Sequence, residues 1–258
     1  MRRRAAGKLP DMGCALRIAE IIGEAWRADV GQGMRLLDVG CATGHFRRTF
    51  VGQSLPIDHY VGLEIDPAMV EAGSEVWYRE IEAGIVHFIN ADLEAYEPDE
   101  SFDVVLCVNA FMYFASAKIA LRNLLKAASG GHLFVRSYFT DANYRIIRAQ
   151  TTLNHDKSSL SELDVFDDEG QIRCYDFWNI YSQTYIEKLV GLLAPEASLC
   201  WLDDQNIFSS LEEERKLTVD KRGATEVLNG YEVSYPFIQP WKYLAVDLTG
   251  TAKASIIH

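Results

Sequence analysis

The stretch Met34-Arg-Leu-Leu-Asp-Val-Gly-Cys-Ala-Thr-Gly-His-Phe46 decides the fold of this chain. Its apolar run, residues 36–39, is typical of a buried strand in a parallel sheet. A loop of small residues follows, and residues 45–50 predict the first turns of a helix. A strand, a tight small-residue turn and a helix are how open α/β sheets bring backbone close to a ligand. The stretch therefore predicts a ligand site at the carboxyl end of its strand.

The spacing of the small residues narrows the choice of ligand. A dinucleotide-binding loop would read Gly-x-Gly-x-x-Gly, but its three glycine positions fall here on Gly40, Ala42 and His45. A phosphate-binding P-loop needs Gly-Lys followed by Ser or Thr, which is also missing. The motif that the sequence does contain is Asp38-x-Gly40-x-Ala42-x-Gly44. The alternative is a buried strand that ends in an ordinary glycine turn.

This motif resembles the first motif of the class I S-adenosylmethionine-dependent methyltransferases, in which a glycine usually stands where this chain has Ala42. Three further segments match the family's motifs in order, so that the resemblance covers residues 34–139. It implies an α/β, Rossmann-like, doubly wound and mostly parallel seven-stranded sheet with a lid inserted after the fifth strand. It also implies S-adenosyl-L-methionine as the cofactor.

Two of those segments carry carboxylates at strand ends. Glu64 closes an expected strand over residues 59–67, where a carboxylate can accept two hydrogen bonds from a ribose diol. Asp92 and Leu93 close the strand expected over residues 86–93. In the family, an aspartate here accepts from the adenine amine and the apolar neighbour flanks the ring. The alternatives are a solvated loop carboxylate for Glu64 and an ordinary capping turn for Asp92.

The fourth segment follows the strand expected over residues 102–109. It resembles the motif of methyltransferases that act on small molecules and proteins, because it lacks the Asn/Asp-Pro-Pro-Tyr tetrapeptide of many enzymes that methylate nucleic-acid bases. Tyr113 stands where many relatives carry histidine, and His155 lies beside Asp156 in the expected lid. Both are candidates for the base that removes the acceptor's proton. The alternatives are pocket lining or core packing for Tyr113, and a surface loop for His155.

The residues that the resemblance and the motif place at the cofactor form one set. His45 is expected near the cofactor's methionine end. The set is Asp38, Gly40, Ala42, Gly44, His45, Phe46, Glu64, Ile65, Asp92, Leu93 and Asn109. No group of residues has the spacing of a metal site.

Composition limits the partners and the compartment. The chain has 258 residues, a net charge of −12 and a pI of about 5.0, which disfavours nucleic acid because phosphates are neutralised by Lys and Arg. The five cysteines are scattered and odd in number, which favours reduced thiols and a cytoplasmic location. No apolar run predicts a signal peptide or a membrane span, so no membrane partner is expected.

The rest of the chain completes the predicted organisation as a single domain over residues 1–258. Residues 1–13 are expected to be loosely ordered, and residues 14–28 to form a helix. Residues 140–180 are expected to form the lid, with a helix from Asn143 to Leu153 and a hairpin turn at 168–170. The further expectations are a helix after Ser182 that runs to Leu193, a strand over 198–208, and closing strands over 231–235 and 241–248.

These features predict methyl transfer to a small-molecule acceptor, with oxygen as the favoured atom. Residues 179–182 and 240–243 resemble a group of small bacterial methyltransferases of sugar and surface-glycan pathways, which favours a sugar, glycan or natural-product intermediate. The alternatives are a protein or RNA methyltransferase and an inactive cofactor-binding regulatory subunit. A homodimer also remains open.

Overall fold

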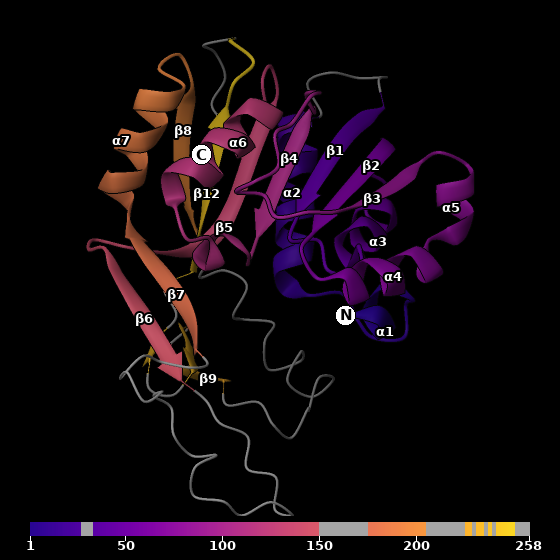
Figure 1. Ribbon diagram of the computed structural model, residues 1–258, viewed down its shortest axis with the longest axis horizontal. Helices are drawn as coiled ribbons and strands as arrows, with labels where there is room; N and C mark the ends of the chain where they lie inside the picture. Colours follow the sequence, from indigo (N-terminus) through magenta and orange to yellow (C-terminus); the bar gives the residue numbers. More distant parts are fainter. Residues whose placement is uncertain are drawn as a thin grey trace, which may run out of the picture.

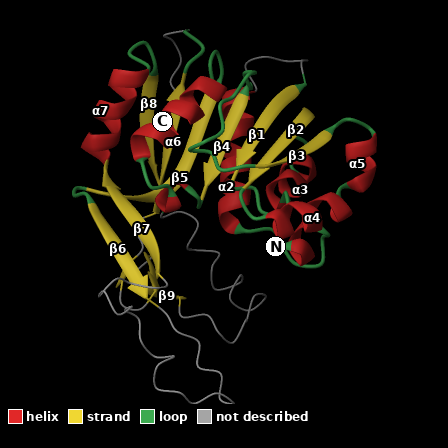
Figure 2. Cartoon of the chain, viewed as in Figure 1, coloured by secondary structure: helices red, strands yellow, loops and turns green. Residues whose placement is uncertain are grey.

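The computed structural model describes residues 1–26, 33–149, 175–204, 225–228, 231–234, 237–238 and 241–250. Helices flank one large sheet on both sides (Figures 1 and 2). The helices are α1 (Arg2–Ala5), α2 (Gly13–Trp26), α3 (His45–Gly52), α4 (Pro67–Val76), α5 (Tyr78–Glu82), the 3-10 turn η1 (Phe111–Tyr113), α6 (Ala117–Ala127) and α7 (Gln183–Leu193). The strands are β1 (Met34–Val39), β2 (Ile57–Glu64), β3 (Val86–Asn90), β4 (Val104–Val108), β5 (His132–Thr140), β6 (Tyr144–Ala149), β7 (Tyr175–Ser182), β8 (Ser198–Asp203), β9 (Thr225–Leu228), β10 (Tyr231–Ser234), β11 (Phe237–Ile238) and β12 (Trp241–Asp247).

The large sheet is mostly parallel. Seven of its strands follow the order β3-β2-β1-β4-β5-β12-β8, and β6 and β7 raise the count to nine. Strands β1 to β5 pair in parallel, whereas β12 runs antiparallel to both β5 and β8. The prediction of a Rossmann-like doubly wound sheet is confirmed. The count of seven holds for the continuous row of strands and misses the two added strands. The short strands β9, β10 and β11 form a separate antiparallel sheet.

The two faces of the sheet are covered by different helices. Along β1, Leu37 and Val39 pack in the cluster that contains α6 and α7, while Leu36 packs in the cluster that contains α2 and α3. Successive strand residues point to opposite faces, so burial on both sides explains why Leu36, Leu37 and Val39 are all apolar. A glycine turn at the end of β1 is thereby held between two packed layers.

Side-chain caps begin the helices at the positions that the sequence predicts. Asp66 Oδ1 accepts a hydrogen bond from the backbone N–H of Ala68 at 2.9 Å, with Pro67 in the first turn of α4. Ser182 Oγ accepts from the N–H of Tyr185 at 3.1 Å, and α7 ends at Leu193 as expected.

The prediction of a helix from Asn143 to Leu153 is wrong as far as the structure describes those residues. Strand β6 occupies 144–149 and pairs antiparallel with β7. The local pattern explains the error: Ile146 packs with the cluster of Met112 and Ile180, whereas Ile147 is 54% exposed. This alternation is that of a strand. The β6–β7 hairpin extends beyond the carboxyl edge of the large sheet, at the lower left of Figure 1. The predicted turn at 168–170 lies outside the described residues.

The first residues of the chain carry more regular structure than their glycines and proline suggest. Helix α1 lies against α3 and α4, and Arg48 Nη1 pairs with Asp11 Oδ1 at 2.9 Å. The contact with α3 supplies the order that the local sequence lacks. Across the part of the chain that the structure describes, no helix has the length and apolar character needed to span a membrane.

Candidate functional site

A cavity of about 390 Å³ opens at the carboxyl ends of β1, β2, β3 and β4. This is the edge at which open α/β sheets bind ligands. The residues that line it are Val39, Gly40, Leu63, Glu64, Ile65, Ala91, Asp92, Leu93, Glu94, Asn109, Ala110, Tyr113 and Phe114. Seven of the residues predicted from sequence are in this set, namely Gly40, Glu64, Ile65, Asp92, Leu93, Asn109 and Tyr113.

The glycine turn after β1 forms the floor of the cavity. Gly40 has a φ of 73°, and a Cβ built on it would lie 2.6 Å from the Cβ of Ala110. A larger residue at position 40 would therefore meet both backbone strain and a steric clash. Ala42 adopts a φ of 51° and Gly44 a φ of 69°. Ala42 and Gly44 shape the turn without lining the cavity.

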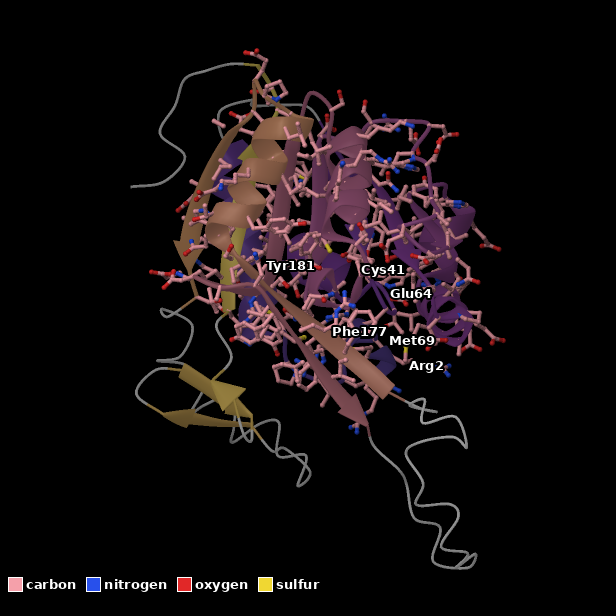
Figure 3. All side chains as sticks on the ribbon, turned by 60° about the vertical axis from the view of Figure 1, so that its left-hand side comes forward. Arg2, Cys41, Glu64, Met69, Phe177 and Tyr181 are labelled. Carbon is pink, nitrogen blue, oxygen red and sulfur yellow. The ribbon has the colours of Figure 1, made fainter. Side chains whose placement is uncertain are left out.

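Glu64 links the end of β2 to the glycine turn. Its Oε2 accepts a hydrogen bond from the N–H of Ala42 at 2.8 Å, and its Oε1 accepts from the N–H of Asp66 at 3.0 Å. Each carboxylate oxygen has two lone pairs, so each retains acceptor capacity toward the cavity. Figure 3 shows Glu64 near Cys41 at this edge of the sheet. Ile65 follows Glu64, lines the cavity and is 64% exposed.

The cavity is electrically negative. Glu64, Asp92 and Glu94 line it, and no Lys, Arg or His is among the described lining residues. Asp92 Oδ1 accepts from the N–H of Glu94 at 2.9 Å. The carboxylate of Glu94 accepts from the N–H groups of Ala115 and Ser116, both at 2.7 Å. A site of this charge suits a cationic ligand better than a pyrophosphate.

Asp38 lies beneath the turn, and its side chain does not line the cavity. Its Oδ2 accepts a hydrogen bond from the hydroxyl of Tyr60 at 2.7 Å, and it is 1% exposed. Burial raises the pKa of Asp38 to about 7; the hydrogen bond from Tyr60 opposes this shift and the charge of Glu64 adds to it. The structure thus places Asp38 as a buried carboxyl group directly before the turn, hydrogen-bonded to Tyr60.

His45 and Phe46 open α3 and are buried outside the cavity lining. His45 is 6% exposed, and neither ring nitrogen has a hydrogen-bond partner among the described residues. Burial, together with the charge of Arg4, lowers the pKa of His45 to about 4, so the ring is neutral at pH 7. The hydroxyl of Thr43, in the same turn, is also buried without a partner. Phe46 packs in the core with Phe50.

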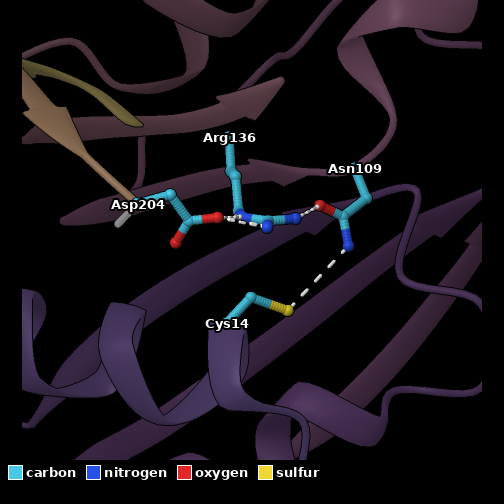
Figure 4. A network of polar contacts seen from close by, with 4 residues as sticks. All are labelled: Cys14, Asn109, Arg136 and Asp204. Carbon is cyan, nitrogen blue, oxygen red and sulfur yellow. Dashed lines mark hydrogen bonds and ion pairs between the residues drawn. The ribbon is translucent and has the colours of Figure 1, made fainter. Parts of the chain in front are cut away.

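A buried polar network holds Asn109 at the end of β4 (Figure 4). Asn109 has a φ of 62°, which is uncommon for a residue other than glycine. Arg136 on β5 donates to the side-chain oxygen of Asn109 and pairs with Asp204, and the amide of Asn109 lies 3.9 Å from Cys14 Sγ. The guanidinium of Arg136 also lies 3.9 Å from the ring centroid of Trp241. The network fixes a strained residue that lines the cavity.

The two candidate bases have different positions. Tyr113 in η1 lines the cavity and is 50% exposed. His155 lies outside the described residues. Among the described residues, no group of His, Cys, Asp and Glu is arranged to hold a metal ion.

Sequence reasoning missed several residues that build the cavity wall. Ala110 faces Gly40, and a small residue directly after Asn109 was the available signal. Glu94 binds two N–H groups at the start of α6, and nothing in its local sequence indicates a partner about twenty residues away. Asn90, Asn123 and Asn179 each donate to two backbone carbonyls of the loops around the cavity, through contacts that the sequence does not reveal.

The residues present fit S-adenosylmethionine. The close approach of Gly40 and Ala110 leaves a backbone cradle at the turn, and Glu64 keeps acceptor capacity for a diol. The three lining carboxylates suit the positive charge of a sulfonium, and the unpartnered polar atoms of Thr43 and His45 lie in the turn and at the start of α3. The chemistry of the donor set therefore agrees with this cofactor.

Comparisons with solved structures agree with the observed fold. An O-methyltransferase from a polyketide synthase multienzyme of Brevibacillus brevis, in complex with S-adenosyl-L-homocysteine, matches with a TM-score of 0.56 and 11% identity, over 90% of this chain and 71% of that one. Coclaurine N-methyltransferase matches with a TM-score of 0.53 and 17% identity, over 90% and 69%. The [4+2]-cyclase SpnF matches with a TM-score of 0.51 and 17% identity, over 90% and 78%. At these identities the matches show the fold.

Sequence relatives extend the comparison. A ubiquinone/menaquinone biosynthesis C-methyltransferase of Ectopseudomonas mendocina is 30% identical over 125 residues, which are 48% of this chain and 49% of the relative. An O-methyltransferase of Penicillium expansum is 28% identical over 124 residues, 45% and 44% of the two chains. The chain thus spans about half the length of the curated relatives it matches.

The family match is broader than these pairwise matches. Residues 31–190 match the family described as "Methyltransferase domain", which is more than half of the chain and includes the glycine turn, Glu64, Asp92 and Asn109. The resemblance drawn from the first motif is thereby confirmed. The chain belongs to the methyltransferase domain family.

Proposed function

We propose that this protein transfers the methyl group of S-adenosylmethionine to a hydroxyl of a small-molecule acceptor, with a sugar, glycan or natural-product intermediate as the favoured class. The observation that carries the proposal is the negative cavity at the carboxyl edge of β1 to β4, floored by Gly40 and lined by Glu64 and Asp92. The lack of Lys, Arg and His among the described lining residues favours a small acceptor over RNA. The scattered cysteines agree with a cytoplasmic enzyme.

The proposed roles follow from position. Glu64 accepts hydrogen bonds from the ribose diol, Asp92 accepts from the adenine amine, and Leu93 and Ile65 contact the ring. The turn formed by Gly40, Ala42 and Gly44, supported by Asp38, binds the amino-acid end of the cofactor, with His45 and Phe46 behind it and Asn109 on the strand beside it. These assignments combine the family resemblance with the cavity lining.

The cofactor supplies a methyl group that is already activated on a positively charged sulfur. The protein therefore has to align the acceptor, exclude water and remove a proton from the acceptor hydroxyl. Among the described lining groups that can accept a proton, Glu64 and Asp92 are assigned to the cofactor and Glu94 binds two backbone N–H groups, which leaves Tyr113 as the proposed base. His155 remains the second proposed base.

Label transfer tests the proposal. The full chain is incubated with S-adenosylmethionine that carries an isotopically labelled methyl group and with panels of sugar nucleotides, glycans and phenolic compounds, and mass spectrometry locates the label. Label on a hydroxyl of a small molecule is expected. Label on protein or RNA, but on no small molecule, would contradict the proposal.

A cofactor-binding subunit without catalytic activity is the second candidate, because Ala42 occupies a left-handed conformation that glycine adopts at lower cost. The fold alone does not decide between them, since one structural neighbour is described as a cyclase. Cofactor binding without label transfer to any panel would favour the subunit.

Tyr113→Phe removes the proposed proton acceptor while keeping the ring. The expected result is a turnover number lowered by roughly 100-fold, the scale of general-base catalysis, with an unchanged dissociation constant for S-adenosylhomocysteine. Tyr78→Phe is the matched control, since Tyr78 is 51% exposed and does not line the cavity. An equal rate in both variants would remove Tyr113 as the base.

A further inference from the structure

The loop over residues 110–116, which contains η1, forms one wall of the cavity and is held by side chains from distant parts of the chain. Asn179 on β7 is 3% exposed. Its amide nitrogen donates to the backbone oxygen of Met112 at 3.1 Å and to that of Phe114 at 2.7 Å. The two accepting carbonyls flank Tyr113, so one side chain fixes the backbone on both sides of that tyrosine.

Arg145 on β6 fixes the orientation of the Asn179 side-chain amide. Its Nε donates to Asn179 Oδ1 at 2.6 Å, and its Nη2 donates to the backbone oxygen of Ala115 at 3.2 Å. The guanidinium carbon lies 4.7 Å from the ring centroid of Phe177, which Figure 3 shows on the hairpin. Because Arg145 occupies the oxygen of Asn179, the amide nitrogen is left to face the carbonyls of the loop.

Glu94 holds the other side of the same loop. Its carboxylate accepts from the N–H groups of Ala115 and Ser116, and Glu94 itself lines the cavity. The loop is therefore clamped between the segment that follows β3 and the β6–β7 hairpin. Any conformation of the loop that breaks these contacts leaves polar groups without hydrogen-bond partners, so the clamp disfavours other conformations of the loop.

Two other asparagine side chains near the cavity also donate to two backbone carbonyls each, but they come from other elements of the fold. Asn90 donates to the backbone oxygens of Glu64 and Ile65, and Asn123 donates to those of Leu93 and Tyr96. Both come from the β1–β5 region with its helices. Asn179 comes from the hairpin that follows β5, so this wall depends on a part of the chain outside the first four motifs.

We infer that Asn179 and Arg145 are positioning residues that hold Tyr113 and Phe114 in the cavity wall, so that the β6–β7 hairpin sets the geometry of the proposed methyl-transfer site. The inference rests on the proposed function for its consequence in catalysis. Its structural core, the dependence of the 110–116 loop on the hairpin, can be measured separately.

The first variant is Asn179→Asp, which keeps the shape of the side chain and its acceptor for Arg145 but removes both donors to the loop. It also places a negative charge against two carbonyl oxygens. Amide hydrogen exchange over residues 110–116 is expected to accelerate at least tenfold, with unchanged exchange in β1 and β2. The dissociation constant for S-adenosylhomocysteine, measured by calorimetry, is expected to rise about tenfold.

Arg145 gives a milder test, because its side chain is exposed and its loss should leave the fold intact. Arg145→Ala is expected to accelerate the same amides, and Arg145→Lys, which keeps one donor, to restore part of their protection. Arg79→Ala on α5 is the matched control, since it removes an exposed arginine far from this loop and should change neither readout. If Asn179→Asp fails to fold, the Arg145 series decides.

A double-mutant cycle separates positioning from general stabilisation. If Asn179 acts through the conformation of Tyr113, Asn179→Asp should weaken S-adenosylhomocysteine binding less in a Tyr113→Ala background than in the wild type. Equal effects in both backgrounds would contradict the inference.

The two proposals fail in distinguishable ways. If the wild type binds S-adenosylhomocysteine and Arg145→Ala leaves both affinity and loop exchange unchanged, the inference is wrong and the proposed function stands. If the wild type does not bind S-adenosylhomocysteine, the proposed function is wrong, and the exchange measurement still decides whether the hairpin holds the loop.

Discussion

The two sides of the cavity are held in different ways. On the β1–β2 side, the turn after β1 is shaped by its own backbone, with Gly40, Ala42 and Gly44 at positive φ. The carboxylate of Glu64, at the end of β2, accepts a hydrogen bond from this turn. On the β4 side, Asn109 and the loop after it are held by side chains from α2, β5, β6 and β7 and by Asp204. A turn shaped by its own backbone leaves a motif in the sequence, whereas contacts between side chains from distant parts of the chain do not.

The largest expected effect lies on the β4 side. Asp204→Ala leaves Arg136 buried without its ion-pair partner, and removal of one partner from a buried pair costs about 3–5 kcal/mol. The free energy of unfolding in denaturant should fall by that amount, and S-adenosylhomocysteine binding should weaken because Asn109 loses a fixed partner.

Asp203→Ala is the neighbouring control. Asp203 pairs with Lys242 at 2.8 Å, and its side chain is 63% exposed. A surface pair of this kind contributes less than about 1 kcal/mol. Equal losses for the two variants would show that the buried network does not hold the β4 side.

The next effect lies on the β1 side and concerns binding. Gly40→Ala places a Cβ at 2.6 Å from that of Ala110 in a left-handed conformation, so the turn must move away from the ligand. The dissociation constant for S-adenosylhomocysteine should rise by about 100-fold, or roughly 2.7 kcal/mol.

Gly52→Ala is the matched control, because a Cβ there meets nothing within 4 Å and Gly52 is absent from the residues with positive φ. Far-UV circular dichroism confirms that both variants fold. Wild-type affinity in Gly40→Ala would remove the turn from the site.

Asp38 provides a pH-dependent test of the same side. The pKa of Asp38 is about 7 in the folded protein, whereas the ordinary value for an aspartate side chain is 3.8. Between pH 3.8 and pH 7 the unfolded chain has lost the Asp38 proton, whereas the folded chain still keeps it. Asp38 therefore contributes fully to the free energy of unfolding below pH 3.8, and this contribution falls as the pH rises to about 7. The slope is at most about 1.4 kcal/mol per pH unit.

Asp38→Asn should flatten this part of the stability profile, as measured by denaturant unfolding across that pH interval. Asp141→Asn, at an exposed position, should leave the profile unchanged. A profile in Asp38→Asn that follows the wild type would place the titrating group elsewhere.

The sequence predicts the parallel strands and the glycine turn within residues 34–139. Five of the residues that it places at the cofactor do not line the cavity, namely Asp38, Ala42, Gly44, His45 and Phe46. The apolar residues before Gly40 and the N-cap at Asp66 depend on near neighbours in the chain, and both are found where the pattern predicts them. Glu64 lines the cavity as the family resemblance implies, although its partner Ala42 is 22 positions away. The β4 side was not predictable in the same way. Asn179 acts on residues that are 65 and 67 positions away, and Arg136 on residues that are 27 and 68 positions away. Only the folded chain brings them together.

The hairpin shows the second limit. The local sequence of residues 144–149 predicts a helix, whereas the chain forms a strand there because it pairs with β7, which comes much later in the sequence. Tertiary pairing decided between two patterns that the local residues permit.

Calorimetric titration of the full chain with S-adenosylhomocysteine, in the wild type, Glu64→Ala and Glu71→Ala, tests the central claim most directly. Glu71 lies on the exposed face of α4 and serves as the control. The account predicts saturable binding to the wild type and to Glu71→Ala, and a dissociation constant at least about tenfold higher, or 1.4 kcal/mol, in Glu64→Ala. No binding to the wild type, or equal affinity in all three proteins, would contradict it.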